Sequence, residues 1–203
     1  MKLYYSPGAC SLSPHIALRE AGLDAEYERV DLRTKKTASG QDLAAINPKG
    51  QVPTLQLDDG TTLTEGPAVV QYIADRAPGS KLAPPAGSIE RYRLMEMLNF
   101  ITTELHKGFS PLFKPDTPED YKQIARRNLE ARLDAVAGML EGKPYLLGQD
   151  FTVADGYLFV ILTWAKVMKF DMGRWPALQD YFARVAARPA VREAMQVEGL
   201  KAA

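Results

Sequence analysis

The first third of the chain alternates short apolar runs with stretches of helical periodicity, which predicts strands and helices in turn. Strands are predicted at 2–5, where Leu3-Tyr4-Tyr5 is a short apolar run, and at 26–32. Between them, the apolar positions of 13–21 recur at helical spacing, and Gly22 stands where such a helix would end. A shorter helix is expected at 39–46. The order strand, helix, strand is typical of an α/β fold.

A hairpin and a further helix complete this part of the pattern. Two predicted strands, at 54–57 and 61–63, flank an Asp-Asp-Gly sequence, and an Asp-Gly pair favours a tight hairpin turn. Residues 65–76 then carry their apolar side chains on one helical face. Together these elements are sufficient for an independent α/β domain.

Only helices are predicted in the rest of the chain. Residues 78–87 are rich in proline and glycine and predict a loop between two domains. The segments with helical periodicity that follow are 89–113, 119–140, 153–170, 177–187 and 190–197. Thr152 and Asp155 are spaced as a capping box, which is a folding signal. The prediction is therefore a small α/β domain at 1–80 followed by an all-α domain at 87–203.

Charge and composition restrict the classes of function. The 203 residues include 25 basic and 25 acidic side chains, so nothing favours binding to nucleic acid or to an anionic membrane. No apolar run approaches the length of a membrane span, and the first residues lack the order of a secretory signal. We therefore expect a cytoplasmic enzyme or binding protein.

The single cysteine and the two histidines limit the metal and redox chemistry. One cysteine excludes an internal disulfide, which favours a reducing compartment. Cys10, His15 and His106 do not have the spacing of zinc ligands, so no metal site is expected. His15 lies beside apolar residues of the first predicted helix and is interpreted as structural.

Cys10 is the first candidate for chemistry. It stands just before a helix start, where Ser11 or Ser13 can act as N-cap and Pro14 suits the first turn. Unpaired backbone N–H groups and the helix dipole favour the reactive thiolate at such a position. The alternative is that a lone cysteine is a small buried apolar residue. This segment alone leaves both interpretations open.

Two segments around the predicted hairpin can bind a peptide-like ligand. Pro53 cannot donate to a sheet, so it marks a bend, where a cis bond is an option and the backbone of Val52 is free to pair. Glu65 can bind an ammonium group while the N–H of Gly66 meets a carboxylate, as an α-amino acid requires. The alternatives are a plain entry into a strand and ordinary helix-start chemistry with Thr64 as the N-cap.

The long predicted helix carries a polar stripe. Asn99, Thr103 and His106 are spaced to share one face of an α-helix, and Glu104 and Lys107 flank them. This face is a candidate edge of a cleft, in which His106 would orient a ligand or stabilise a thiolate. The alternative is an ordinary solvated helix surface.

Taken together, these segments resemble the cytosolic glutathione transferases, and specifically the bacterial beta class. The resemblance spans essentially the whole chain. Its motifs are Ser6-Pro7-Gly8-Ala9-Cys10-Ser11, Asn47-Pro48-Lys49-Gly50-Gln51-Val52-Pro53, Leu63-Thr64-Glu65-Gly66, Glu104-Leu105-His106-Lys107 and Phe151-Thr152-Val153-Ala154-Asp155. It implies a thioredoxin-like N-terminal domain, an all-α C-terminal domain, and a homodimer with glutathione bound between the domains.

The resemblance also implies roles for individual residues. Val52 would pair its backbone with the cysteinyl part of glutathione, just before a cis proline. Glu65 and Gly66 would hold the γ-glutamyl end, and Lys35 and Gln51 would lie near the glycyl end or the cleft wall. The residues implied around glutathione are Cys10, Lys35, Gln51, Val52, Glu65, Gly66, Asn99, Thr103, Glu104 and His106, with those of the helical domain possible contributions of either subunit.

Cys10 and His106 are the catalytic candidates, and three functions remain to be separated. The first is conjugation of glutathione to small, fairly apolar electrophiles, as in detoxification. Candidate residues for its acceptor pocket are Tyr5, Pro7, Phe109 and Trp164. The second is a glutathione-dependent thiol–disulfide oxidoreductase, peroxidase or reductive dehalogenase in which Cys10 forms a mixed disulfide. The third is a non-catalytic binding module, against which the combination of Cys10, Glu65 and His106 argues.

Overall fold

The computed structural model describes residues 1–201 of the chain. Its strands are β1 (Lys2–Tyr5), β2 (Glu26–Asp31), β3 (Lys36–Thr37), β4 (Thr54–Gln56) and β5 (Thr62–Thr64). Its α-helices are α1 (Leu12–Glu20), α2 (Leu43–Ile46), α3 (Gly66–Arg76), α4 (Ile89–Phe100), α5 (Lys107–Phe113), α6 (Glu119–Met139), α7 (Val153–Val167), α8 (Pro176–Ala186) and α9 (Pro189–Val197). Shorter elements are the 3-10 turns η1 (Pro78–Ser80) and η3 (Met172–Arg174) and the π-helical segment η2 (Ile101–His106).

The five strands form one sheet in the order β3-β2-β1-β4-β5. β1 and β2 run parallel with α1 as the connection between them, whereas β4 pairs antiparallel with both β1 and β5. This confirms the predicted strand–helix–strand unit and the predicted hairpin. β3 pairs antiparallel with the end of β2 and is too short for periodicity to indicate it.

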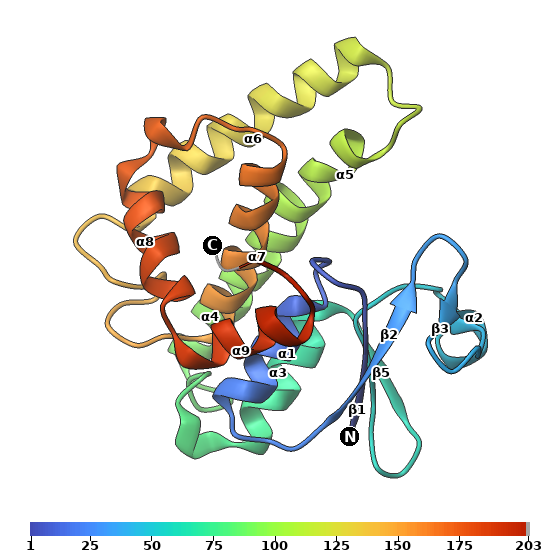
Figure 1. Cartoon of the computed structure of the whole chain (residues 1–203). Coiled ribbons are helices and arrows are strands. Elements are labelled where there is room, and N and C mark those ends of the chain that lie inside the picture. Colours follow the sequence, from blue (N-terminus) through green and yellow to red (C-terminus); the bar gives the residue numbers. More distant parts are fainter. Residues whose placement is uncertain (202–203) are drawn as a thin grey trace.

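The helices divide into two groups around this sheet. Figure 1 shows α4 to α9 gathered on one side of the molecule, with α1 and α3 between them and the sheet. The predicted change from an α/β part to an all-helical part is confirmed. No helix in the described part of the chain, residues 1–201, is both long and apolar enough to cross a membrane.

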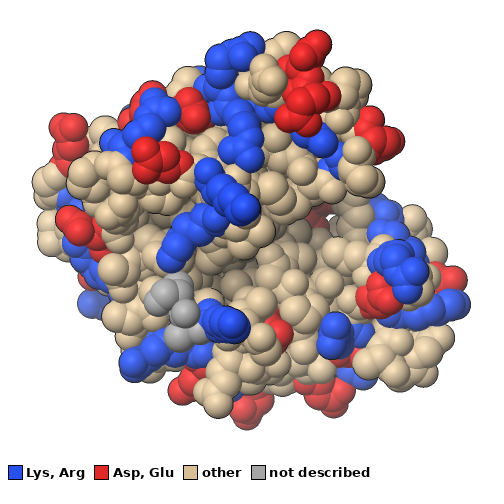
Figure 2. All heavy atoms as spheres, turned by 45° about the horizontal axis from the view of Figure 1, so that its top comes forward, with Lys and Arg blue, Asp and Glu red and all other residues tan. Residues whose placement is uncertain are grey.

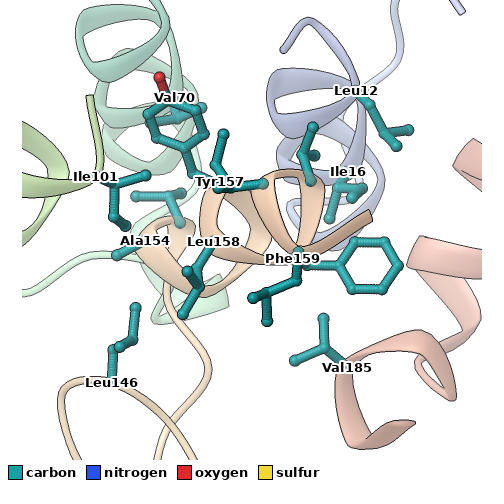
Figure 3. Close-up of a cluster of buried hydrophobic side chains, with 14 of the residues drawn as sticks. Leu12, Ile16, Val70, Ile101, Leu146, Ala154, Tyr157, Leu158, Phe159 and Val185 are labelled. Atoms are coloured by element: carbon teal, nitrogen blue, oxygen red, sulfur yellow. The ribbon is translucent and has the colours of Figure 1, made fainter. Parts of the chain in front are cut away.

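Helix α7 is the buried centre of the helical part. Of its 15 residues, 12 are buried, as expected for a helix that is apolar on all sides. Figure 3 shows Leu158 and Phe159 of α7 among side chains from α1, α3 and α8. Gly156 lies where α7 approaches α1, since a methyl group in its place would stand 3.5 Å from the Ile16 side chain. The glycine thus permits close packing of these two helices.

Asp155 holds the start of α7 and is fully buried. Its carboxylate accepts hydrogen bonds from the backbone N–H of Thr152 at 2.8 Å and of Leu146 at 2.9 Å. The Tyr181 hydroxyl donates a third, at 3.0 Å. The predicted capping box is therefore confirmed. The Asp155 carboxylate has a structural role, because its oxygens accept hydrogen bonds from groups that hold the start of α7.

Two helices are shorter than predicted. α7 ends at Val167 rather than at residue 170, because Lys169 adopts a left-handed backbone angle, φ 57°, that a helix cannot continue through. α2 begins at Leu43 rather than at residue 39. There the Asp42 carboxylate accepts a hydrogen bond from the Ala44 N–H at 2.9 Å and caps the helix.

Candidate functional site

A pocket of about 200 Å³ lies where the strand-bearing part of the chain meets η2 and α7. Its walls come from the start of α1, the bend before β4, the start of α3, η2 and α7. The lining residues are Ala9, Cys10, Leu32, Lys35, Asn47, Lys49, Gln51, Val52, Pro53, Thr64, Glu65, Gly66, Pro67, Thr102, His106, Lys107 and Tyr157. Figure 2 shows the surface hollowed between the α5–α6 hairpin and the part that carries β2, β3 and α2.

Cys10 lines this pocket as a protonated thiol. Its Sγ donates a hydrogen bond to the Val52 carbonyl at 3.4 Å. Burial raises the pKa of the Cys10 thiol to about 11, and the N–H groups of Cys10 and Ser11 offset that rise only in part. Of the two interpretations left open by the sequence, the raised pKa favours the buried, protonated cysteine in the protein without a ligand.

The loop before α1 is held by residues far away in the sequence. Gly8 has a φ of 70°, which favours glycine. Its N–H donates to Glu198 Oε2 at 2.9 Å, and its carbonyl accepts from Trp164 Nε1 at 2.8 Å. Ser11, predicted to cap α1, exchanges two hydrogen bonds with the backbone of Ser6 instead. The shape of this loop thus depends on α7 and on the end of α9.

The bend before β4 has the predicted form, with a cis peptide bond between Val52 and Pro53. Asn47 holds the bend, because its Nδ2 donates to the Gln51 carbonyl and to the Thr54 hydroxyl, each at 2.9 Å. In this arrangement the Val52 carbonyl faces the pocket thiol.

Glu65 stands at the N-cap position of α3 with a left-handed backbone angle, φ 69°. Thr64 precedes it and does not cap the helix, so the alternative with Thr64 as the N-cap is excluded. A non-glycine residue in this region of backbone angles is strained, and such residues cluster at functional sites. The Glu65 carboxylate lies 2.8 Å from Lys49 Nζ at the pocket edge.

Lysines make up most of the remaining charge of the pocket. Lys35, Lys49 and Lys107 all line it, and Lys35 Nζ donates to the Gly50 carbonyl at 3.0 Å. One carboxylate together with several ammonium groups suits a ligand that carries an amine and more than one carboxylate.

His106 belongs to η2, which interrupts the long helix predicted at 89–113. Its Nδ1 lies 2.6 Å from the Tyr157 hydroxyl, and its ring meets the Trp164 ring edge-on at 4.9 Å. Burial, and secondly the positive charge of Lys107, lowers the pKa of His106 to about 4. The imidazole is therefore neutral near neutral pH.

The π-helical segment breaks the predicted polar stripe. A π turn contains more residues than an α turn, so His106 shares the pocket wall with Thr102 rather than with Asn99 or Thr103. Asn99, Thr103 and Glu104 do not line the pocket of their own chain. Glu104 instead lies 2.7 Å from an arginine of α6.

The residues predicted for an acceptor pocket are placed elsewhere. Phe109 is fully buried and Tyr5 nearly so, which makes both core residues. Pro7 and Trp164 do not line the pocket of the thiol either. None of these four side chains therefore lines the pocket of Cys10, and their part in an acceptor pocket stays a prediction.

Some pocket residues were not singled out by sequence reasoning. Lys49 lies inside the motif at 47–53, so its position was indicated although its role was not. Thr102 and Tyr157 had no distinguishing signal, because neither the π turn nor the contact between α7 and η2 follows from periodicity.

His15, predicted to be structural, lies outside the pocket. It is fully buried, and its Nδ1 lies 3.0 Å from Glu198 Oε1. Among residues 1–201, no three side chains of the histidine, cysteine, aspartate and glutamate types are grouped so that they could hold a metal ion.

Family models and relatives agree on the class of protein. The model of the glutathione S-transferase N-terminal domain matches residues 8–76, and that of the C-terminal domain matches residues 100–189. The glutathione S-transferase GstA of Escherichia coli is 51% identical over 201 residues, which cover 99% of this chain and 100% of that protein.

Solved structures show the same similarity. A ternary complex of BphK, a bacterial glutathione S-transferase, has a TM-score of 0.97 at 60% identity, with 98% of this chain and 100% of that chain covered. A beta-class glutathione S-transferase of Sphingomonas chungbukensis has a TM-score of 0.96 at 47% identity, with 99% and 100% covered. The chain therefore belongs to the glutathione S-transferase family and is a glutathione transferase of the bacterial beta class.

Proposed function

We propose that the pocket beside Cys10 binds glutathione and that the enzyme conjugates its sulfur to small, fairly apolar electrophiles. The observation that carries this proposal is the convergence in one pocket of the Val52 backbone, the Glu65 carboxylate and the lysine side chains. A sphingomonad glutathione S-transferase complexed with glutathione has a TM-score of 0.96 at 49% identity, with 99% of this chain and 100% of that chain covered, which supports the assignment of the ligand.

The tripeptide would be held at both ends and in the middle. Val52 would pair its backbone with the cysteinyl part, because an extended peptide binds best through main-chain hydrogen bonds. Glu65 would bind the ammonium group of the γ-glutamyl end and the Gly66 N–H its carboxylate. Lys35 and Gln51 would lie at the glycyl end.

Cys10 and His106 are the proposed catalytic residues: both would lie near the glutathione sulfur, His106 acting in conjugation and Cys10 in thiol exchange. Conjugation needs the glutathione thiolate, which attacks an electrophilic carbon as the leaving group departs with its electron pair. The pocket must therefore lower the pKa of the glutathione thiol by placing hydrogen-bond donors around the sulfur.

Thiol exchange at Cys10 is the second candidate function. In it the Cys10 thiolate attacks one sulfur of glutathione disulfide, a mixed disulfide forms, and glutathione leaves as its thiolate. Its support is the position of Cys10 on the pocket wall. The raised pKa of the Cys10 thiol leaves little thiolate at neutral pH, which favours conjugation as the main activity.

The test measures both activities in the same variants. We expect wild type and Cys10→Ala to conjugate glutathione to chlorodinitrobenzene at similar rates. Glu65→Gln should raise the KM for glutathione about tenfold through loss of a charge-assisted contact. Glu193→Gln is the matched control: it makes the same change on the exposed face of α9 and should leave the KM for glutathione unchanged.

The same proteins are incubated with glutathione disulfide and analysed by intact mass spectrometry. A glutathione adduct on a wild-type protein that does not conjugate glutathione would make thiol exchange the main function. Absence of conjugation and of any adduct in wild type would contradict both candidates and favour a binding module.

We also propose a homodimer in which α4 supplies the interface. Three large apolar side chains of α4 are exposed at helical spacing, namely Ile89 at 64%, Tyr92 at 58% and Met95 at 39%. Asn99 continues the same side of the helix up to the start of η2, the segment that carries Thr103 and Glu104. In a symmetric dimer this surface would bring Asn99, Thr103 and Glu104 to the partner's glutathione site.

The dimer is tested with one charged substitution and one control. Tyr92→Glu should shift the mass measured by light scattering from dimer to monomer, because it buries a carboxylate in an apolar interface. Tyr121→Glu changes a side chain of similar exposure, 53%, on α6 and should leave the dimer intact. A monomeric wild type, or an unchanged Tyr92→Glu dimer, would contradict this interface.

The domain bounds and the cellular location are also proposals. Residues 1–80 are proposed as the glutathione-binding domain and residues 87–203 as the helical domain. A cytoplasmic location is proposed because the single cysteine suits a reducing compartment.

A further inference from the structure

Tyr157 of α7 lines the pocket together with His106. We propose that Tyr157 is a positioning residue that fixes the tautomer of His106, so that the imidazole presents an N–H donor to the sulfur of bound glutathione. The donor role toward glutathione rests on the proposed function, whereas the tautomer itself is a property of the protein without a ligand.

The contact between the two side chains is short and enclosed. The Tyr157 hydroxyl lies 2.6 Å from His106 Nδ1, and only 3% of Tyr157 is exposed. The two rings meet edge to face, with centroids 5.9 Å apart and planes at 89°. Trp164 contacts the imidazole as a second aromatic ring, at 4.9 Å and 77°. The imidazole therefore has little freedom to turn over.

The direction of this hydrogen bond follows from the chemistry of the two groups. Burial raises the pKa of Tyr157 well above its usual range, so the phenol keeps its proton. Among the described residues, His106 Nδ1 is the hydrogen-bond partner of the Tyr157 hydroxyl, whereas the neighbouring Thr102 hydroxyl bonds to the Leu98 carbonyl at 2.8 Å. The Tyr157 hydroxyl then donates to Nδ1, since a buried O–H without an acceptor would be costly.

A neutral imidazole that accepts at Nδ1 carries its proton on Nε2. The two histidines differ at this atom. Among residues 1–201, His15 Nε2 is a buried atom without a hydrogen-bond partner, whereas His106 Nε2 is not one of the buried atoms without a partner. Because His106 lines the pocket with Cys10, its Nε2–H can reach a sulfur bound there. The opposite tautomer would present a lone pair to the thiolate and repel it.

This arrangement makes His106 a hydrogen-bond donor and not a general base. A base would need a pKa near the working pH, and burial lowers the pKa of His106 to about 4. A donor of fixed direction stabilises the glutathione thiolate without changing its own protonation.

The tautomer is measured directly by nitrogen NMR of histidine-labelled protein without a ligand. The chain has only two histidines, so the spectrum is simple to assign. We expect His106 to be the Nε2–H tautomer in wild type and a mixture of both tautomers in Tyr157→Phe. An Nδ1–H tautomer in wild type, or an unchanged spectrum in Tyr157→Phe, would overturn the proposal.

The second measurement is the pKa of the glutathione thiol bound to each variant, read from thiolate absorbance. In Tyr157→Phe this pKa should rise by about one unit, with about a tenfold lower kcat/KM at neutral pH and little change in KM. Tyr181→Phe is the matched control, because its hydroxyl is equally buried but bonds to Asp155, away from the pocket. It should lose stability without changing the tautomer or the thiol pKa, and an unchanged thiol pKa in Tyr157→Phe would overturn the donor role.

Two substitutions of His106 test the position of the N–H donor without relying on Tyr157→Phe to fold. The quantity measured is again the pKa of the bound glutathione thiol. His106→Gln places an amide N–H near the position of Nε2 and should keep much of the lowered thiol pKa. His106→Asn places its amide near Nδ1 and should not. Equal thiol pKa values in these two variants would overturn the proposal. Absence of conjugation in wild type, with the expected tautomers present, would count against the proposed function and not against the tautomer.

Discussion

We expect Glu198→Ala to lower the free energy of unfolding by about 3–5 kcal/mol, the range found when one partner of a buried pair is removed. The Glu198 and His15 side chains are both fully buried, with Glu198 Oε1 3.0 Å from His15 Nδ1. Glu198 Oε2 also accepts the N–H of Gly8 at 2.9 Å. The substitution leaves both groups without a partner and opens a cavity between α1 and α9.

The measurement is urea unfolding at one fixed protein concentration, with the free energy extrapolated to water. Glu193→Ala is the matched control on the same helix. Glu193 is exposed and lies 3.7 Å from an arginine of α1, so its loss should change the free energy by less than about 1 kcal/mol. Glu198→Gln keeps one acceptor and should fall between the two. Equal losses in Glu198→Ala and Glu193→Ala would contradict a structural role for the buried carboxylate.

This buried contact illustrates what the sequence could not indicate. His15 could be assigned to the core from its apolar neighbours, but nothing in the chain connects it to Glu198, which is 183 positions away. Pairing of a polar residue with a distant one depends on how α1 and α9 pack, and no periodicity reports that. The anchoring of Gly8 by the end of α9 was hidden for the same reason.

The parts of the site that sequence reasoning located are those where local chemistry decides the structure. The bend at Val52 and Pro53 needs a residue without an N–H, and the Asp155 box needs only its own helix start. Motifs of this kind can be predicted from the sequence because the residues that form them are close together along the chain. Their order along the chain then identified the family.

The polar stripe was misplaced because its prediction assumed an uninterrupted α-helix. The spacing of Asn99, Thr103 and His106 puts them on one face only at α-helical periodicity. The π-helical segment η2 changes that periodicity where the pocket lies, and brings Thr102 to it. The interruption coincides with the contact between His106 and Tyr157, which is a tertiary interaction.

The protonation state of the Cys10 thiol decides between the two interpretations that the sequence left open. We expect the alkylation of Cys10 by iodoacetamide, without glutathione, to rise with pH toward a midpoint near 11 instead of near 9.0. Only the thiolate reacts, so at about pH 8 a rise of two pKa units makes the rate about one hundredfold lower than for an ordinary thiol. The single cysteine makes the signal unambiguous.

The same protein unfolded in urea provides the control, because its thiol is then fully solvated and should react at the ordinary rate. The pH midpoint of alkylation shows which of two opposing effects on the Cys10 sulfur is larger. Burial favours the thiol and its hydrogen bond to Val52, whereas the N–H groups of Cys10 and Ser11 favour the thiolate. A midpoint at or below the ordinary value would mean that the helix start outweighs burial. Cys10 would then be reactive at neutral pH, and thiol exchange would become the stronger candidate function.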